Sequence, residues 1–143
     1  MDLEKKVQIL ELAYAGVLAD SVNCFGKEGV LEKVTEEKKK VQMALGKQQA
    51  ERYGIQKPEE VFTKLAEIFN CASWEINREG DGFIAESKMC KLCAIAKKMG
   101  TSSPCCIYCL NPMEGMVKAI NPNSTFEVME TLWDGQKCRI AVK

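Results

Sequence analysis

The chain has 143 residues, of which 46% are hydrophobic and 28% charged, the composition of a soluble globular protein. Its 20 basic and 20 acidic residues give a formal net charge of zero, which argues against a nucleic-acid-binding surface. No uninterrupted apolar run approaches the length of a membrane span, and the charged, periodic N-terminus does not resemble a signal peptide. We therefore expect a cytoplasmic protein with a single domain, residues 1–143, and with neither nucleic acid nor a membrane as its partner.

The cysteine and histidine content narrows the chemistry, since the chain has eight cysteines and no histidine. Without a secretory signal, the cysteines are not expected to form a disulfide framework, and their thiols would be free for metal or redox chemistry in a reducing cytoplasm. The lack of histidine removes the commonest general base and the commonest non-thiol zinc ligand.

Residues 1–72 are expected to be helical. A hydrophobic stripe with alternating steps of four and three residues predicts a first helix over residues 2–19. Because the stripe is narrow, as in a coiled coil, it predicts packing on another helix, a homodimer through the N-terminal helices, or ordinary core packing. The stripe is formed by Leu3, Val7, Leu10, Tyr14 and Val17.

The rest of this helical half follows the same logic. After a predicted break at residues 24–29, a helical pattern runs from Val30 and is closed by Gly54. Gly46 inside this pattern predicts close packing or a break between two helices. A further helix is expected from Pro58 to near Cys71, and we interpret Cys71 as a core residue.

Residues 73–143 combine strands with helices. A first hairpin is expected over residues 74–88 around Gly80-Asp81-Gly82, and a second over residues 126–142 around Asp134-Gly135. Two hairpins separated by helices predict an α+β fold, in which the N-terminal helices and a cysteine-bearing helix pair pack on one antiparallel sheet.

The second hairpin makes a register prediction. A two-residue loop would put Trp133 opposite Gln136. The same register places Glu130 opposite Arg139, a favourable cross-strand pair, and turns Cys138 toward the apolar face.

The stretch Met89–Leu110 contains most of the candidate functional residues, because it holds two CxxC pairs. Four thiolates that converge satisfy a tetrahedral Zn²⁺ ion, and cysteine thiolates also hold iron–sulfur clusters. We therefore predict a zinc or iron–sulfur site with ligands Cys90, Cys93, Cys106 and Cys109. Cys105 and Cys138 are additional candidates.

The predicted helices bring these thiols together. One helix is expected over residues 89–99, closed by Gly100, and a second from Pro104 to about Ala119 with Ser103 as its N-cap. On each helix the two cysteines of a CxxC pair share a face. The short connection predicts antiparallel neighbours. Cys105 and Cys106 point about 100° apart on a helix, so only one of them is expected to join the site.

Two other interpretations of the cysteines stay open. Free cysteine is a small, commonly buried residue, so the thiols are also compatible with plain core packing. A dithiol redox site is the other alternative, because Cys90 lies close to the start of its helix, where a thiolate is favoured.

Several features, spread in order over most of the chain, match a known pattern. They are Phe25–Gly29 (FGKEG), Gly46–Gly54 (GKQQAERYG), Cys90–Gly100 (CKLCAIAKKMG), Cys105-Cys106, Asn121-Pro122, Glu127–Thr131 (EVMET) and Thr131–Val142 (TLWDGQKCRIAV). With them the chain resembles the L-2-amino-thiazoline-4-carboxylic acid hydrolase-like family and the related vinyl-4-reductase-like small-molecule-binding domains. The resemblance implies helices on an antiparallel sheet, a pocket between them and often a dimer. It also implies hydrolysis of a small cyclic thiazoline acid or binding of a small effector.

Three functions follow from the sequence. The first is a binding module for a metal ion or cluster, with room for a small-molecule ligand. The second is a hydrolase whose nucleophile is a thiolate among Cys90, Cys105 and Cys106, or which uses a carboxylate such as Glu114 or an open metal site. The third is a metal-free regulatory domain whose apolar ligand cavity is walled by Trp74, Phe83, Met113, Met116 and Trp133.

Overall fold

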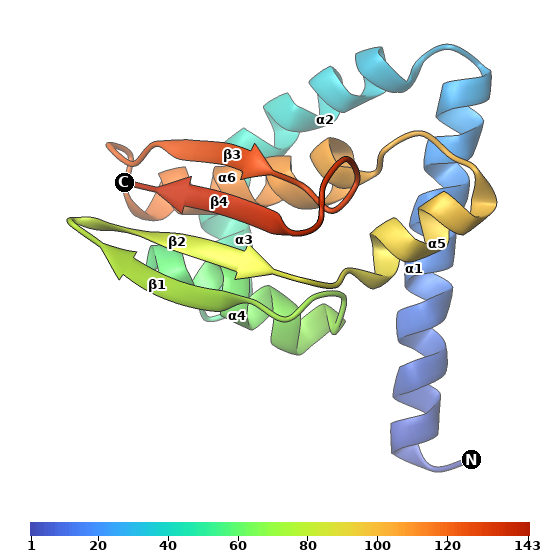
Figure 1. Ribbon diagram of the computed structural model, residues 1–143, viewed down its shortest axis with the longest axis horizontal. Coiled ribbons are helices and arrows are strands. Elements are labelled where there is room, and N and C mark those ends of the chain that lie inside the picture. The colour runs from blue at the N-terminus through green and yellow to red at the C-terminus, as the bar shows by residue number, and fades with distance from the viewer.

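The computed structural model describes all residues, Met1–Lys143, and combines helices with one four-stranded antiparallel sheet (Figure 1). The α+β class predicted from the sequence is therefore confirmed. The helices are α1 (Leu3–Lys27), α2 (Leu31–Ala44), α3 (Gly46–Arg52), α4 (Pro58–Phe69), α5 (Lys91–Met99), the π-helix η1 (Cys106–Leu110) and α6 (Asn111–Ile120). The strands are β1 (Glu75–Glu79), β2 (Gly82–Ser87), β3 (Phe126–Glu130) and β4 (Cys138–Val142).

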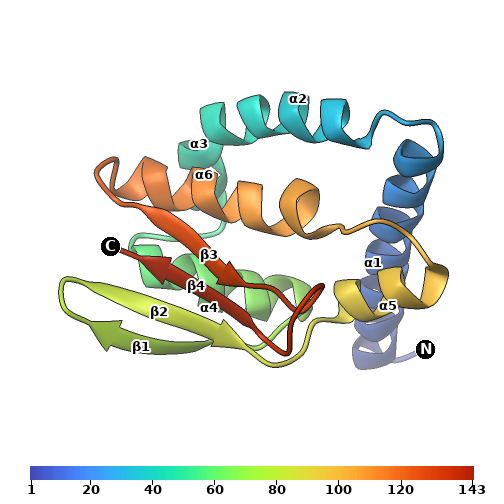
Figure 2. The ribbon, with the colours of Figure 1, turned by 45° about the horizontal axis from the view of Figure 1, so that its top comes forward.

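The sheet joins the two predicted hairpins in the order β1-β2-β4-β3, so the inner strand of each hairpin pairs with that of the other. Helices α4 and α6 lie on one face of the sheet, and α2 and α3 pack on α6 from its far side (Figure 2). Helices α1 and α5 pack against each other at one end. The main core lies between the sheet and α4 and α6, and it includes Phe62, Phe83, Met113, Val117 and Ile140.

The predicted side-by-side pair of cysteine-bearing helices is wrong. α5 packs on α1, whereas α6 packs on α2, α3 and α4. The small residues Ala15 and Ala19 of α1 and Ala96 of α5 are buried together, so the two backbones approach closely at this contact. Only the N-terminal ends of the two cysteine-bearing segments meet, through the thiols of Cys93 and Cys105.

The first helix is longer than predicted, because α1 runs through the expected break at residues 24–29 as far as Lys27. Val22, just before this stretch, is fully buried. Tertiary packing of the last turns therefore overrides the weak helix propensity of the glycine in Cys24-Phe25-Gly26. The chain turns only at Gly29, whose φ of 71° suits glycine.

The register prediction for the second hairpin is half wrong. Glu130 does pair with Arg139, and Cys138 is buried as expected. However, β3 carries a bulge between Val128 and Glu130, and the two-residue loop between Trp133 and Gln136 does not form. The cause is visible at Glu130, whose carboxylate accepts hydrogen bonds from the backbone amides of Gln136 (2.8 Å) and Lys137 (3.1 Å) and so holds a wider loop.

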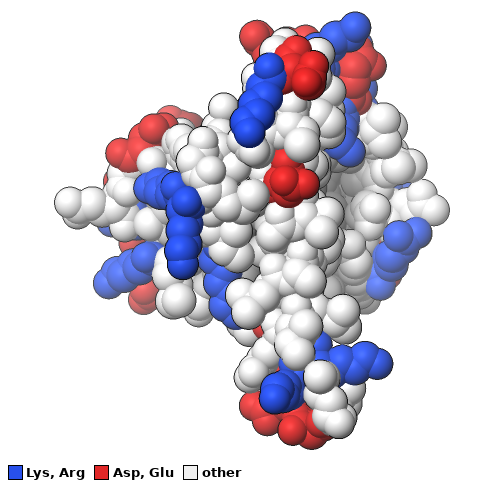
Figure 3. Space-filling view, turned by 90° about the vertical axis from the view of Figure 1, so that its right-hand side faces the viewer, with Lys and Arg blue, Asp and Glu red and all other residues white.

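The N-terminal half of α1 extends beyond the body of the molecule (Figure 1). Its five stripe residues are all exposed, and the face that contains α1 is largely uncharged between charged clusters at its two ends (Figure 3). A homodimer through this helix stays a prediction. By length and composition alone, α1 is also long and apolar enough to cross a membrane, although the sequence has no uninterrupted apolar run of that length. A cytoplasmic location likewise stays a prediction.

Candidate functional site

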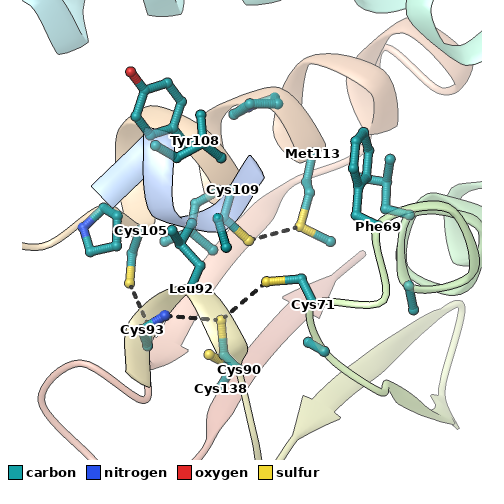
Figure 4. Close-up of a pocket in the computed structure, with 18 of the residues that line it drawn as sticks. Phe69, Cys71, Cys90, Leu92, Cys93, Cys105, Tyr108, Cys109, Met113 and Cys138 are labelled. Carbon is teal, nitrogen blue, oxygen red and sulfur yellow. Dashed lines mark hydrogen bonds between the residues drawn. The ribbon is translucent and has the colours of Figure 1, made fainter. Parts of the chain in front are cut away.

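A cavity of about 340 Å³ lies where α1, the α2–α3 junction, α4, α5 and η1–α6 meet (Figure 4). It is lined by 30 residues, of which 22 are hydrophobic. Trp74, Met113 and Met116 belong to its wall, as the third sequence-based hypothesis expected, but Phe83 and Trp133 do not. The size and the apolar lining are typical of pockets that bind small molecules, which measure about 300–1,000 Å³.

Six of the eight cysteines line this cavity, and their sulfur atoms come from four different segments (Figure 4). Five of them were candidates from the sequence. The sixth, Cys71, was interpreted as a core residue. The lining cysteines are Cys71, Cys90, Cys93, Cys105, Cys109 and Cys138, whereas Cys24 and Cys106 are exposed elsewhere.

Of the four predicted metal ligands, Cys106 lies apart from the others. The local helix geometry explains its position. Residues 106–110 form a π-helix, which closes its hydrogen bonds from i to i+5 and adds about one residue to each turn. Cys106 and Cys109 therefore do not share a face as they would on an α-helix. Pro112, just beyond this segment, lacks the N–H group that a regular α-helix needs there.

Cys90 occupies the N-cap position of α5, where the first backbone N–H groups of a helix have no carbonyl partner. Its sulfur accepts a hydrogen bond from the Cys93 amide at 3.5 Å, and the Cys71 sulfur lies 3.6 Å away. Donation from the Cys71 thiol and then from Cys93 lowers the pKa of Cys90 to about 3, and it raises the pKa of Cys71 well above its usual range. Of this pair, Cys90 is the sulfur whose negative charge is favoured by its surroundings.

A second pair lies next to the first, because the sulfur atoms of Cys93 and Cys105 are 3.5 Å apart. Both residues are buried. The Cys93 thiol donates, which lowers the pKa of Cys105 and raises that of Cys93. The Cys93 backbone amide, which donates to the Cys90 sulfur, links this pair to the first.

The two remaining thiols are protonated packing groups. Burial raises the pKa of Cys109, whose thiol points to the sulfur of Met113 at 3.7 Å. Burial also raises the pKa of Cys138 to about 11, and its sulfur accepts from the Leu132 amide at 3.4 Å.

The predicted four-thiolate site is not formed. No group of three or more cysteine, aspartate or glutamate side chains is arranged to hold a metal ion, and Cys106 is exposed outside the cavity. A zinc or iron–sulfur role for the other thiols stays a prediction, which elemental analysis of protein purified without oxygen would test.

Two glutamines that the sequence did not single out face the cavity. The side-chain oxygens of Gln42 and Gln49 are buried and have no hydrogen-bond partner. The Gln42 amide nitrogen donates to the Ile107 carbonyl at 2.9 Å. That carbonyl has no helical donor, because the Asn111 amide bonds to Cys106 and Pro112 has no N–H group. The proline therefore leaves a carbonyl that binds the Gln42 amide nitrogen, while the Gln42 oxygen has no partner. The sequence alone does not show this link, because it depends on the contact between α2 and η1.

Only some of the catalytic residues proposed for a hydrolase line the cavity. Cys90 and Cys105 line it, but Glu114 lies outside and forms ion pairs with Lys118 (2.8 Å) and Lys39 (3.5 Å). The carboxylate at the cavity is instead that of Glu11, which accepts from Asn70 at 3.1 Å.

Comparison of the chain with protein-family models, with curated proteins and with solved structures finds no match. The family resemblance described above thus stays a prediction, and the cavity itself is the basis for any statement about function.

Proposed function

We propose that the protein binds a small, largely apolar molecule in the thiol-lined cavity. The observation that carries this proposal is the lining itself, 22 hydrophobic residues out of 30 around about 340 Å³ of space. An apolar ligand gains roughly 25 cal/mol for each Å² of apolar surface that leaves water, so burial alone supplies affinity for a molecule of this size.

The polar groups of the cavity restrict the ligand further. Gln42 and Gln49 each present a buried oxygen without a partner, and a buried acceptor left unpaired costs about 1–3 kcal/mol. A ligand with an N–H or O–H group next to its apolar body would remove this cost. We therefore expect a small ring or short-chain molecule with at least one hydrogen-bond donor.

Filling the cavity should abolish binding. Ala66 lies on α4 in the cavity wall, and Ala66→Phe would place a ring in the space that the ligand needs. With the uncharged dye N-phenyl-1-naphthylamine, which has one N–H group, we expect fluorescence enhancement with the parent chain and binding at least about tenfold weaker in the variant. Ala94→Phe, at an exposed position of α5 outside the wall, is the matched control and should bind like the parent. Equal binding by both variants would place the dye elsewhere and reject the proposal.

Gln49→Leu should have opposite effects on stability and on binding. The substitution removes a buried acceptor without a partner at nearly constant side-chain size, so we expect a gain of about 1 kcal/mol in the free energy of unfolding. Thermal unfolding should show a rise of about 3 °C in Tm, whereas dye binding should weaken because one acceptor is lost. Gln48→Leu, exposed on the same helix, should change stability by less than about 0.5 kcal/mol. A loss of stability in Gln49→Leu would mean that this amide is already satisfied.

A further inference from the structure

We propose that Cys90 and Cys71 form a dithiol that reduces a small apolar organic disulfide inside the cavity, with Cys90 as the attacking thiolate and Cys71 as the resolving thiol. The exchange reaction rests on the proposed function, because the disulfide must enter the same cavity. It adds a covalent step and a substrate class to simple binding.

The backbone holds the two cysteines together although they are far apart in sequence. Ala72 and Cys90 form an isolated antiparallel bridge, and the Lys91 amide donates to the Cys71 carbonyl at 2.8 Å. This bridge fixes the two side chains next to each other, with their sulfur atoms 3.6 Å apart (Figure 4). A disulfide requires about 2.05 Å, so the two sulfur atoms must approach by about 1.5 Å to form the bond.

The two sulfur atoms have different environments, and this difference assigns their roles. Cys90 lies at the N-terminus of the nine-residue helix α5 and accepts from the Cys93 amide, so its negative charge is stabilised. Cys71 follows the C-terminal end of α4, and its hydrogen bond to Cys90 and its burial raise its pKa, although the Leu92 amide acts in the opposite direction. Both are half-buried and line the cavity, so a ligand in the cavity can contact them.

The neighbouring pair is less suited to this reaction. Cys93 and Cys105 are buried, at 5% and 7% exposure, so a ligand reaches them less readily than the half-buried Cys71 and Cys90. The other titratable groups around Cys90 are the thiols of Cys109 and Cys138 and the ion pair of Glu11 with Lys91 at 3.7 Å.

The reaction balances in two steps. The Cys90 thiolate attacks one sulfur of the substrate RSSR, which forms a mixed disulfide and releases RS⁻. Cys71 then loses its proton and attacks the Cys90 sulfur, which forms the Cys71–Cys90 disulfide and releases the second RS⁻. The protein dithiol is oxidised by two electrons, and the organic disulfide is reduced to two thiols.

The test uses 4,4′-dithiodipyridine, an uncharged aromatic disulfide whose released thiopyridone absorbs light. The parent chain for this test is the Cys24→Ser/Cys106→Ser variant, which lacks the two exposed thiols, treated with a chelator and kept free of oxygen. At pH 6 an ordinary thiol is ionised to less than about 1%, whereas a thiolate of low pKa is a weaker nucleophile, so Cys90 should react on the order of tenfold faster than the remaining cysteines. We expect a fast phase that releases two equivalents of thiopyridone per chain.

Single substitutions in this parent separate the two roles. Cys71→Ser keeps a hydroxyl donor beside Cys90 and should release one fast equivalent and retain the mixed disulfide. Cys90→Ser should lose the fast phase. Ala94→Phe, outside the cavity wall, is the matched control and should still release two equivalents. Peptide mapping of the oxidised parent should find the Cys71–Cys90 disulfide. Two fast equivalents from Cys71→Ser, or a disulfide that includes Cys93 in place of Cys71, would overturn the assignment.

The same protein distinguishes failure of the exchange from failure of the proposed function. Ala66→Phe should slow the fast phase at least tenfold, since the disulfide no longer fits. If the dye binds the parent and is excluded by Ala66→Phe but no fast phase occurs, only the exchange is rejected. If a fast phase persists unchanged in Ala66→Phe, the reaction does not take place in the cavity, and the exchange as proposed here is rejected too.

Discussion

Gly46→Ala is expected to destabilise the protein by about 2 kcal/mol or more, although alanine is the better helix former. Gly46 opens α3, and a Cβ atom added there would collide with the carbonyl of Gly115 in α6. Alanine at Gly115 is blocked as well, because a Cβ there would lie 2.5 Å from the Gln42 carbonyl oxygen. Both obstacles are backbone atoms, so no side-chain rotation relieves them and the helices must move apart.

The sign of the effect makes the measurement decisive. In an unobstructed helix, glycine to alanine stabilises by about 1 kcal/mol, and Gly16 in α1 offers such a position because nothing lies within 4 Å of a Cβ there. Urea unfolding should therefore move the midpoint down for Gly46→Ala and up for Gly16→Ala. Gly46 also lines the cavity between Gln42 and Gln49, so dye binding should weaken together with stability. A stabilised Gly46→Ala would show that α3 and α6 are not in contact at this point.

The same glycine illustrates what the sequence could predict. Gly46 interrupts a helical pattern, and both consequences expected of it, a break between two helices and close packing, are present. The first hairpin, the C-terminal end of α5 at Gly100 and the start of the next helix after Ser103 also follow from local signals, since Gly100 has a φ of 72° and Ser103 accepts from the Cys105 amide at 3.2 Å. Turn and capping signals of this kind involve only a few neighbouring residues, so the sequence is enough to predict them.

The candidate site is formed by contacts between segments that are distant in sequence, and the sequence predicted only some of its residues. Cys71 meets Cys90 only because a single bridge joins the end of α4 to the start of α5. Cys106 lies outside the site because the segment before Pro112 is a π-helix. A prediction that assumes α-helical spacing does not include this change. The stripe of α1, by contrast, lies on a helix as predicted and is exposed, and a homodimer through it stays a prediction.

Phe62→Ala is expected to have the largest effect on stability, about 3–5 kcal/mol, which is a large share of the 5–15 kcal/mol typical of a domain. Phe62 lies on α4 and is completely buried. Its ring packs edge to face on Trp74 (5.1 Å between centroids) and Phe83 (5.7 Å), and stacks on Phe126 (6.3 Å). These partners belong to three different segments, so no single movement of the backbone can close the space that the ring leaves.

The consequence for the cavity follows from Trp74, which contacts Phe62 on one side and lines the cavity with the other. Loss of the ring should loosen Trp74, which a shift of tryptophan emission would report, and should weaken dye binding even in the folded fraction. Phe25→Ala, at a half-buried position of α1 outside both the core clusters and the cavity, is the control and should cost about 1 kcal/mol or less. Equal losses for the two variants would mean that the aromatic cluster does not anchor the cavity wall.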